Sequence, residues 1–125
     1  IRKRTSYNEE TTLMTTRQWG HYNVLYEADG CKVKELVIQP GKKISMQKHF
    51  LRSEHWFVVS GTALLYTYDE ENKRISLKNI YSKWNHLHIP VQEWHQIENA
   101  AEEELHIIEI QYGENCTEED IFRNV

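Results

Sequence analysis

The chain has few of the residues that would tie it into a small disulfide or zinc scaffold. Only two of its 125 residues are cysteines, Cys31 and Cys116, and they lie far apart with no Cys-x-x-Cys pair. Two such cysteines do not form a zinc site by themselves. Their number is compatible with a single disulfide, and equally with a reducing compartment in which both cysteines stay free. With no recognisable signal peptide in the sequence, we expect a cytoplasmic protein.

Long apolar runs and clusters of positive charge are also missing. No stretch approaches the ~20 apolar residues that a membrane helix needs, so we expect no membrane partner. The net charge is −4 and the basic residues are scattered, apart from residues 2–4, which we interpret as a solvated tail. Nucleic-acid binding requires a clustered basic face. We therefore expect no nucleic-acid partner.

Aromatic residues, in contrast, are plentiful. Four Trp and seven Tyr argue against disorder, because disordered chains are poor in such residues. A chain of this length corresponds to one domain and is long enough to bury a core. We therefore expect a single domain across residues 1–125.

The sequence predicts many short strands rather than helices. The segments are rich in Val, Ile, Leu, Tyr or Trp, or alternate apolar with polar residues, and turn signals such as Asp29-Gly30 and Ser60-Gly61 separate them. Such a series is typical of an antiparallel sandwich or barrel, an all-β fold. The expected strands are residues 21–26, 31–38, 43–49, 54–59, 62–68, 74–80, 86–89, 94–98 and 105–111.

One helix is expected, near the end of the sequence. Thr117 with Asp120 three residues later resembles a capping box. Glu118 and Glu119 add the negative charge that the N-terminus of a helix favours. These residues predict a short helix over residues 117–123.

Four potential metal ligands lie on or beside the expected strands. In a strand over residues 43–49, Gln47 and His49 share a wholly polar face with Ser45 and project in parallel. Glu54 opens the next strand and His95 lies near the start of a later one. Imidazole and carboxylate groups are ordinary ligands for transition metals, and a carboxamide oxygen can complete the set. The spacing alone leaves a metal site and ordinary surface or core histidines equally open.

Beyond this spacing, the sequence resembles a known family. Its residues match the two cupin motifs, with Gln in place of the usual leading His of the first motif. Residues 52–63 in particular are similar to the type II phosphomannose isomerases, which often form the C-terminal domain of bifunctional mannose-1-phosphate guanylyltransferases. The similarity extends to residues 17–22, 108–114 and 119–121. The first motif is matched by Gly41, Gln47, His49, Glu54 and Gly61, and the second by residues 90–95 with Asn99.

The resemblance implies a cupin barrel, also called a double-stranded β-helix or jelly roll, with one divalent Zn, Mn, Co or Fe ion held by Gln47, His49, Glu54 and His95. It implies isomerisation of a hexose phosphate, most simply mannose 6-phosphate to fructose 6-phosphate, in polysaccharide biosynthesis. The substrate partner would be a phosphorylated sugar, and we expect a homodimer. The remaining expected roles are a catalytic base in Glu109, a catalytic and phosphate-binding cation in Arg52, and substrate contacts from Lys34, Ser45 and Trp56.

The sequence also departs from the family pattern. Phe50 and Leu51 replace two of three consecutive histidines, and Gln92 replaces a usual Gly, from which we expect a reshaped turn beside His95. Two other functions therefore stay open. One is a non-catalytic metal- or sugar-binding module, and the other is a cupin for a different activated sugar, for which Tyr66 or Tyr68 would supply an acid/base group.

Overall fold

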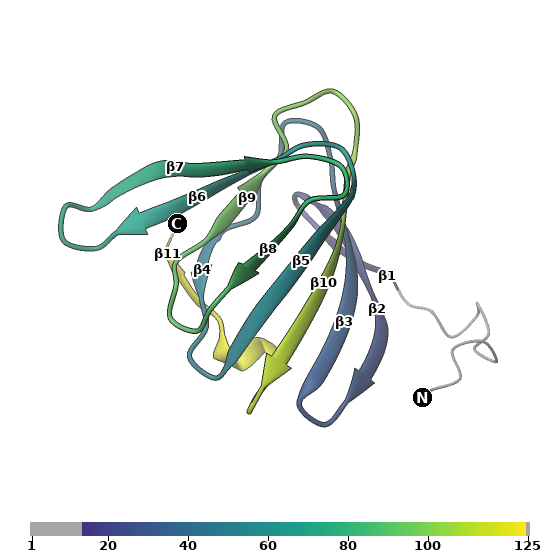
Figure 1. Ribbon diagram of the computed structural model, residues 1–125, viewed down its shortest axis with the longest axis vertical. Coiled ribbons are helices and arrows are strands. Elements are labelled where there is room, and N and C mark those ends of the chain that lie inside the picture. Colours follow the sequence, from purple (N-terminus) through teal and green to yellow (C-terminus); the bar gives the residue numbers. More distant parts are fainter. Residues whose placement is uncertain (1–13, 125) are drawn as a thin grey trace.

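A computed structural model describes residues 14–124, and in these residues antiparallel strands account for nearly all regular structure (Figure 1). The alternation of apolar and polar residues therefore predicted the all-β class correctly. The strands and one short 3-10 turn, η3, are β1 (Met14–Arg17), β2 (Gly20–Ala28), β3 (Cys31–Ile38), β4 (Met46–Lys48), β5 (Arg52–Ser60), β6 (Ala63–Asp69), β7 (Arg74–Tyr81), β8 (His86–Ile89), β9 (Gln96–Glu98), β10 (Leu105–Gly113), η3 (Glu118–Asp120) and β11 (Phe122–Asn124).

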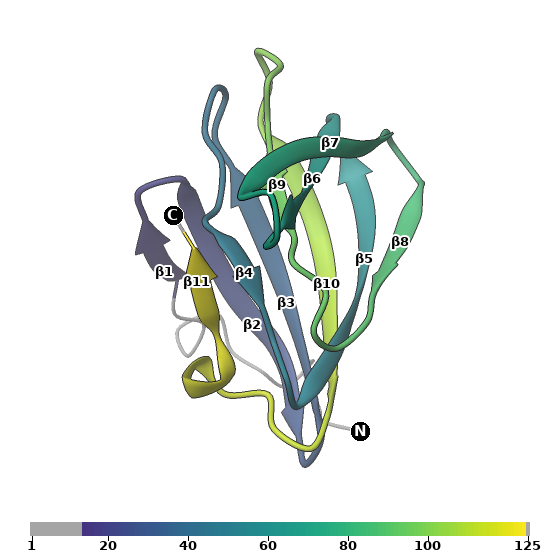
Figure 2. The ribbon, with the colours of Figure 1, turned by 90° about the vertical axis from the view of Figure 1, so that its left-hand side faces the viewer.

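The strands form one large sheet and two small ones. The large sheet has the order β1-β2-β3-β10-β5-β8, and the small sheets have the orders β7-β6-β9 and β11-β4. Figure 2 shows β4 and β11 lying in front of the curved large sheet, with β6, β7 and β9 across one end. The buried core between the sheets is formed by Leu36, Ile38, Ile44, Trp56, Val58, Ala63, Leu65, Leu87, Ile89, Ile97, Leu105 and Ile107.

The two central strands of the large sheet change character along their inner faces. Along β5 the buried positions alternate with outward-facing ones and run from Arg52 and Glu54 to Trp56 and Val58. Along the antiparallel β10 they run from Leu105 and Ile107 to Glu109 and Gln111. The register pairs Gln111 with Glu54, so the polar halves of both strands lie side by side. The apolar half closes the barrel, and the polar half forms one end of its interior.

The helix expected over residues 117–123 is not present. The chain makes only the 3-10 turn η3, and Thr117 forms no side-chain capping hydrogen bond. Ile121 is already extended, and the next three residues form β11, which pairs with β4. The strand β4 supplies a sheet partner for this segment, and its Lys48 pairs with Phe122, 74 residues later. This pairing outweighs the local helical signal. Neither β11 nor β1 was predicted from the sequence.

The strand expected over residues 43–49 is shorter than predicted. Only Met46–Lys48 form β4, while Lys43 makes an isolated bridge to Glu98. A second bridge joins Gln47 to His95, whose backbone groups exchange hydrogen bonds of 2.9 and 2.8 Å. This bridge brings the first and second cupin-like motifs together.

Two further expectations concern the ends and the cysteines. Cys31 and Cys116 are both free in the structure, so the disulfide is not formed. The basic residues 2–4 lie outside the described part of the chain. None of the described residues forms a helix that is long and apolar enough to cross a membrane.

The turn beside His95 keeps the backbone conformation that glycine favours, although Gln92 occupies it. Gln92 has a φ of 64°, and its N–H donates to the carbonyl of His49 at 2.6 Å. The expected reshaping of this turn is therefore wrong. The hydrogen bond holds the turn in place, and Gln92 adopts the left-handed backbone conformation at a cost of roughly 1–2 kcal/mol.

Replacing Gln92 should reveal this strain. We expect Gln92→Gly to raise the free energy of unfolding by up to about 1 kcal/mol, because the relieved strain exceeds the added entropy of the unfolded chain. Gln92→Val should lower it by about 1 kcal/mol or more, because β-branched residues tolerate positive φ poorly. Urea unfolding of the three proteins measures both changes. A valine variant as stable as the original chain would contradict the strained turn.

Candidate metal centre and its cavity

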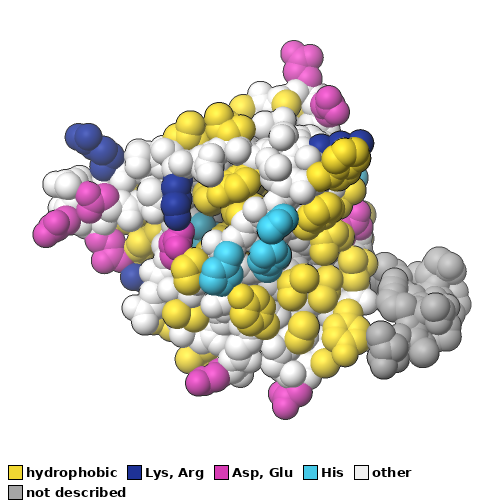
Figure 3. Space-filling view, in the orientation of Figure 1, with side chains coloured by type: hydrophobic (Ala, Val, Ile, Leu, Met, Phe, Trp, Pro, Cys, Tyr) yellow, Lys and Arg dark blue, Asp and Glu magenta, His cyan; other side chains and the backbone are white. Residues whose placement is uncertain are grey.

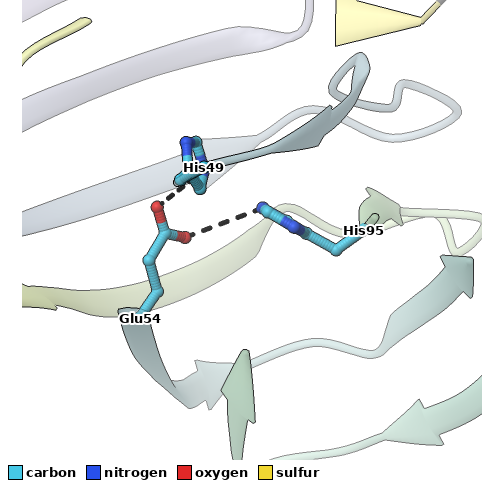
Figure 4. Close-up of side chains that lie close together, drawn as sticks. All are labelled: His49, Glu54 and His95. Carbon is cyan, nitrogen blue, oxygen red and sulfur yellow. Dashed lines mark ion pairs between the residues drawn. The ribbon is translucent and has the colours of Figure 1, made fainter. Parts of the chain in front are cut away.

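Three side chains with metal-binding groups converge inside the polar end of the barrel. His49 follows β4, Glu54 lies on β5 and His95 directly precedes β9, and their ligand atoms all lie within 4.8 Å of one another (Figure 4). The Nε2 atom of His49 is 3.0 Å from Glu54 Oε2, and that of His95 is 3.8 Å from Glu54 Oε1. All three residues are almost completely buried, with exposures of 1–2 %.

The outer nitrogens of both imidazoles are fixed by backbone carbonyls. His49 Nδ1 lies 3.2 Å from the carbonyl oxygen of Asp120, and His95 Nδ1 lies 3.0 Å from that of Glu93. Because a carbonyl oxygen only accepts hydrogen bonds, each Nδ1 carries the proton and each Nε2 presents a lone pair. This is the arrangement by which proteins orient metal-binding histidines.

The inward-facing nitrogens fit a divalent cation. Within the described part of the chain, neither Nε2 of His49 or His95 has a hydrogen-bond partner, although both atoms are buried and face the Glu54 carboxylate. Two lone pairs facing a carboxylate at close range leave buried acceptors without donors, which is costly unless a cation lies between them. Two neutral imidazoles and a carboxylate form a donor set that suits zinc, manganese, iron or cobalt.

Glu54 is held as an anion despite its burial. Burial pushes its pKa upward, but contacts with His49, His95 and Glu109 outweigh this and hold the pKa well below its ordinary value. Trp56 Nε1 donates to Glu54 Oε1 at 2.8 Å, and Arg52 donates to Oε2 through Nε at 3.0 Å. Burial lowers the pKa of His95, which favours the neutral form of the imidazole, the form that binds metals.

Glu109, the expected catalytic base, lies next to this carboxylate. Burial raises the pKa of Glu109 well above its ordinary value, and the charge of Glu54 raises it further. Gln111 Nε2 donates to Glu109 Oε1 at 3.1 Å and fixes the orientation of the carboxyl group. The register places Glu109 between Lys34 on β3 and Trp56 on β5. A raised pKa suits a carboxyl group both to take and to give a proton.

Arg52 lies inside the protein rather than in a solvated loop. Its Nε and Nη2 atoms both contact Glu54 Oε2 at 3.0 Å, and Nη1 donates to the carbonyl of Thr117 at 3.0 Å. The guanidinium group is therefore engaged in orienting Glu54 and in anchoring the segment before η3. Its assignment as a phosphate contact stays a prediction.

A cavity of about 500 Å³ lies beside these residues and receives several of the predicted side chains. Gln47 donates a hydrogen bond from its side-chain nitrogen to Ser45 Oγ at 2.9 Å, which leaves the side-chain oxygen of Gln47 for another partner. Tyr66 and Tyr68 do not line the cavity; Tyr66 donates to Glu98, and Tyr68 packs against Trp94. The predicted residues that line the cavity are Lys34, Ser45, Gln47, Arg52, Trp56 and Glu109.

His55 lies on the opposite face of β5 from Glu54, as the strand period predicts. Its ring centroid is 5.2 Å from that of His86 and 6.5 Å from that of His88. Figure 3 shows histidine side chains gathered on this outer face of the large sheet. The residue that directly follows a candidate ligand therefore takes no part in the metal centre.

Sequence reasoning missed Asp120, which joins the metal centre to the segment after β10. Besides the contact of its carbonyl with His49, its carboxylate accepts the backbone N–H of Phe50 at 3.1 Å and of Leu51 at 2.8 Å. The sequence showed only an acidic residue in an expected helix. Its true role depends on the pairing of β11 with β4, for which no local signal exists.

Comparison with known proteins identifies relatives of this chain. The chain is 38 % identical over 107 residues to a putative mannose-1-phosphate guanylyltransferase of Vibrio cholerae, covering 86 % of this chain and 22 % of that protein. It is 35 % identical over 127 residues to a mannose-1-phosphate guanylyltransferase of Sinorhizobium fredii, covering 97 % and 23 %. It is also 35 % identical to the alginate biosynthesis protein AlgA of Pseudomonas aeruginosa, in an alignment that covers 86 % of this chain and 21 % of AlgA. The chain thus spans about a fifth to a quarter of the length of these relatives.

Solved structures confirm the barrel. The capsular polysaccharide assembling protein CapF of Staphylococcus aureus superposes with a TM-score of 0.74 at 21 % identity, covering 90 % of this chain and 34 % of CapF. Oxalate decarboxylase of Bacillus subtilis gives a TM-score of 0.76 at 16 % identity, covering 94 % and 31 %. Both are cupins, and at this identity the likeness shows the fold alone.

A family model described as mannose-6-phosphate isomerase C-terminal matches residues 4–124, almost the whole chain. Together with the relatives above, this match shows that the chain is a cupin domain that belongs to the mannose-6-phosphate isomerase C-terminal family.

Proposed function

We propose that this domain is a metal-dependent isomerase that interconverts mannose 6-phosphate and fructose 6-phosphate. The observation that carries the proposal is the convergence of the candidate ligands His49, Glu54 and His95 at the polar end of the barrel, next to a cavity that Glu109 lines. An aldose–ketose isomerisation needs groups of these two kinds: a centre that holds the sugar oxygens and a side chain that moves a proton between neighbouring carbons.

The proposed metal ligands are His49, Glu54 and His95, with the side-chain oxygen of Gln47 as the fourth. A divalent ion held there supplies a Lewis acid that stabilises negative charge on the sugar oxygens. The chain's own residues prepare this site, because Arg52 and Trp56 hold the Glu54 carboxylate in one orientation. The ion's identity among Zn, Mn, Co and Fe is left to metal analysis.

Glu109 is the proposed proton carrier. Its raised pKa makes it a better base than an ordinary carboxylate once it is ionised, and a competent acid once it is protonated. The carboxylate of Glu109 takes the proton from the second carbon of the aldose and returns it to the first carbon, so that one carboxyl group acts as base and then as acid. The proton of the hydroxyl group on the second carbon passes to the oxygen of the first carbon, which completes the change from aldehyde to ketone. Gln111 keeps the carboxyl oriented during both transfers.

The charge of the cavity favours an anionic substrate. Among residues 14–124, the lining contains five cationic side chains, from Arg17, Lys34, Lys43, Arg52 and Arg123, against the acids Glu109 and Glu118. Ser45 adds a hydroxyl group for a sugar oxygen. A cavity lined mainly by positive charges attracts and orients a phosphorylated sugar. This feature supports a sugar phosphate over a neutral sugar.

The relatives suggest a setting for the reaction. They are named as mannose-1-phosphate guanylyltransferases and as an alginate biosynthesis protein, so we place the proposed activity in the supply of activated mannose for polysaccharides. We also propose a homodimer, supported by the exposed apolar side chains of Phe57, Val59 and Tyr112 on the outer face of the large sheet.

Removal of both imidazoles should abolish metal binding. The double variant His49→Ala/His95→Ala should lose the single equivalent of zinc, manganese or cobalt that the original chain keeps after dialysis, as measured by elemental mass spectrometry. His55→Ala is the matched control, because His55 lies next to Glu54 but on the outer face, and it should keep the metal. A double variant that keeps one equivalent would show that the ligand set is wrong.

Asp120 should act through His49. We expect Asp120→Ala to weaken metal affinity by about 10–100-fold, because it frees the loop that carries His49 and loosens the carbonyl that sets its tautomer. Competition with a fluorescent chelator measures the affinity, and ¹⁵N NMR of the imidazole reports the tautomer. Glu119→Ala, at the exposed neighbouring position, should change neither. An Asp120→Ala protein with unaltered affinity and tautomer would remove Asp120 from the site.

The isomerase activity itself is tested by turnover. Metal-loaded protein should convert mannose 6-phosphate to fructose 6-phosphate, lose this activity with a chelator and regain it with added metal. Glu109→Gln should lower kcat by at least about 100-fold, the usual contribution of general acid–base catalysis, while metal content stays unchanged. Absence of turnover with either sugar phosphate in fully metallated protein would favour the non-catalytic binding module instead.

A further inference from the structure

Lys34 and Glu118 form an ion pair on the wall of the cavity. Lys34 Nζ lies 3.2 Å from Glu118 Oε2 and 4.1 Å from the centre of the Tyr22 ring. The side chain of Lys34 is only 7 % exposed, whereas that of Glu118 is 48 % exposed. The ammonium group is therefore held in place, and the carboxylate that neutralises it extends from the surface.

Other cations surround the same carboxylate. Partial burial pushes the pKa of Glu118 upward, but the charge and hydrogen bond of Lys34, with the charges of Arg52 and Arg17, outweigh this and lower the pKa. Arg52 is already engaged with Glu54, so Lys34, which contacts Glu118 directly, is the cation whose charge Glu118 mainly balances. All four residues line the cavity. Arg17 lies close to Lys34, because its guanidinium carbon is 5.3 Å from the centre of the same Tyr22 ring. The carboxylate of Glu118 thus already occupies a place beside two cations of the cavity wall.

The position of this ion pair suits one end of a sugar phosphate. On the inner face of the large sheet, Lys34 pairs with Glu109, and Glu109 pairs with Trp56, the neighbour of Glu54 on that face. Two strand spacings, about 10 Å, therefore separate β3 from the strand that carries Glu54. An extended hexose phosphate can bridge such a distance, with its phosphate at Lys34 and the oxygens of its reacting carbons toward Glu54, so that Glu109 lies between the two ends.

We propose that the carboxylate of Glu118 occupies an anion subsite formed by Lys34 and Arg17, and that the phosphate of the substrate displaces it. This inference rests on the proposed function and specifies where the phosphate binds. Glu118 belongs to the single turn η3 and is half exposed, so its side chain can swing into solvent without moving a core residue. A phosphate carries about −1.5 to −2 charges and three acceptor oxygens, and so replaces one carboxylate with a stronger partner.

The exchange keeps the ammonium group of Lys34 paired at every stage. A buried ammonium group without a partner is costly, so Glu118 keeps Lys34 paired while the cavity holds no anion. A neutral sugar offers no charge to take the place of Glu118, and its binding leaves the ion pair intact. A phosphorylated sugar replaces the charge that it displaces, at the cost of competing with Glu118 for Lys34.

Removal of the internal anion should strengthen binding of the external one. Isothermal titration of metal-loaded protein with inorganic phosphate and with mannose 6-phosphate should give a Kd at least about threefold lower for Glu118→Gln than for the original chain. Mannose, the neutral probe, should bind both proteins equally. Glu119→Gln is the matched control, since it removes the same charge from the exposed neighbouring position, and its Kd values should be unchanged.

Three results would overturn the proposal. An unchanged or higher Kd in Glu118→Gln would show that the carboxylate does not compete with phosphate. An equal gain in Glu119→Gln would assign the effect to net charge. A gain that persists in Glu118→Gln/Lys34→Gln would place the anion elsewhere. Because the inorganic phosphate titration needs no turnover, its outcome stands apart from that of the isomerase assay, and a failure of either is recognised separately.

Discussion

The ionised carboxylate of Glu54, almost wholly removed from water, governs the arrangement of the polar end of the barrel. A buried charge is tolerated only when donors and opposite charges surround it. Trp56 and Arg52 provide hydrogen bonds to its two oxygens, and His49 and His95 lie against the same atoms. The core residue Trp56 thus serves the site as well as the packing. Its indole closes the apolar half of the barrel while its N–H faces the polar half.

The same carboxylate reaches the segment after β10 through Arg52. Because the guanidinium group that neutralises Glu54 also donates to the carbonyl of Thr117, the turn η3 is attached to the metal centre from one side. Asp120 attaches it from the other side, through the loop that carries His49. The candidate metal ligands Glu54 and His49 are therefore both joined to the segment around η3, which also carries Glu118 on the cavity wall.

Much of this could be predicted from the sequence because it depends on local patterns. The alternation along residues 31–38 and 86–89 predicted those strands with their observed bounds. The spacing of Gln47 and His49, with the resemblance to the cupin motifs, selected residues that the structure brings together. The period of two also separated His55 from the metal centre.

What could not be predicted depends on partners distant in the sequence. The pairing of β11 with β4 is invisible locally, so the acidic residues after Thr117 were interpreted as the start of a helix. For the same reason Asp120 was missed. At Gln92 the side chain argued for a changed turn, but a backbone hydrogen bond to His49 imposes the left-handed conformation on a residue that does not prefer it. Tertiary hydrogen bonds overrode local preference in each case.

The contact between Phe50 and Asp120 joins residues 70 positions apart. Closure of so long a loop carries an entropic cost that only the completed sheet offsets. The strands β2, β3, β5 and β10 pair without this contact, whereas the orientation of His49 depends on it. The candidate ligand His49 therefore takes its orientation only where η3 and β11 are docked against the loop that follows β4, although β4, the strand before His49, lies more than 70 residues earlier in the chain.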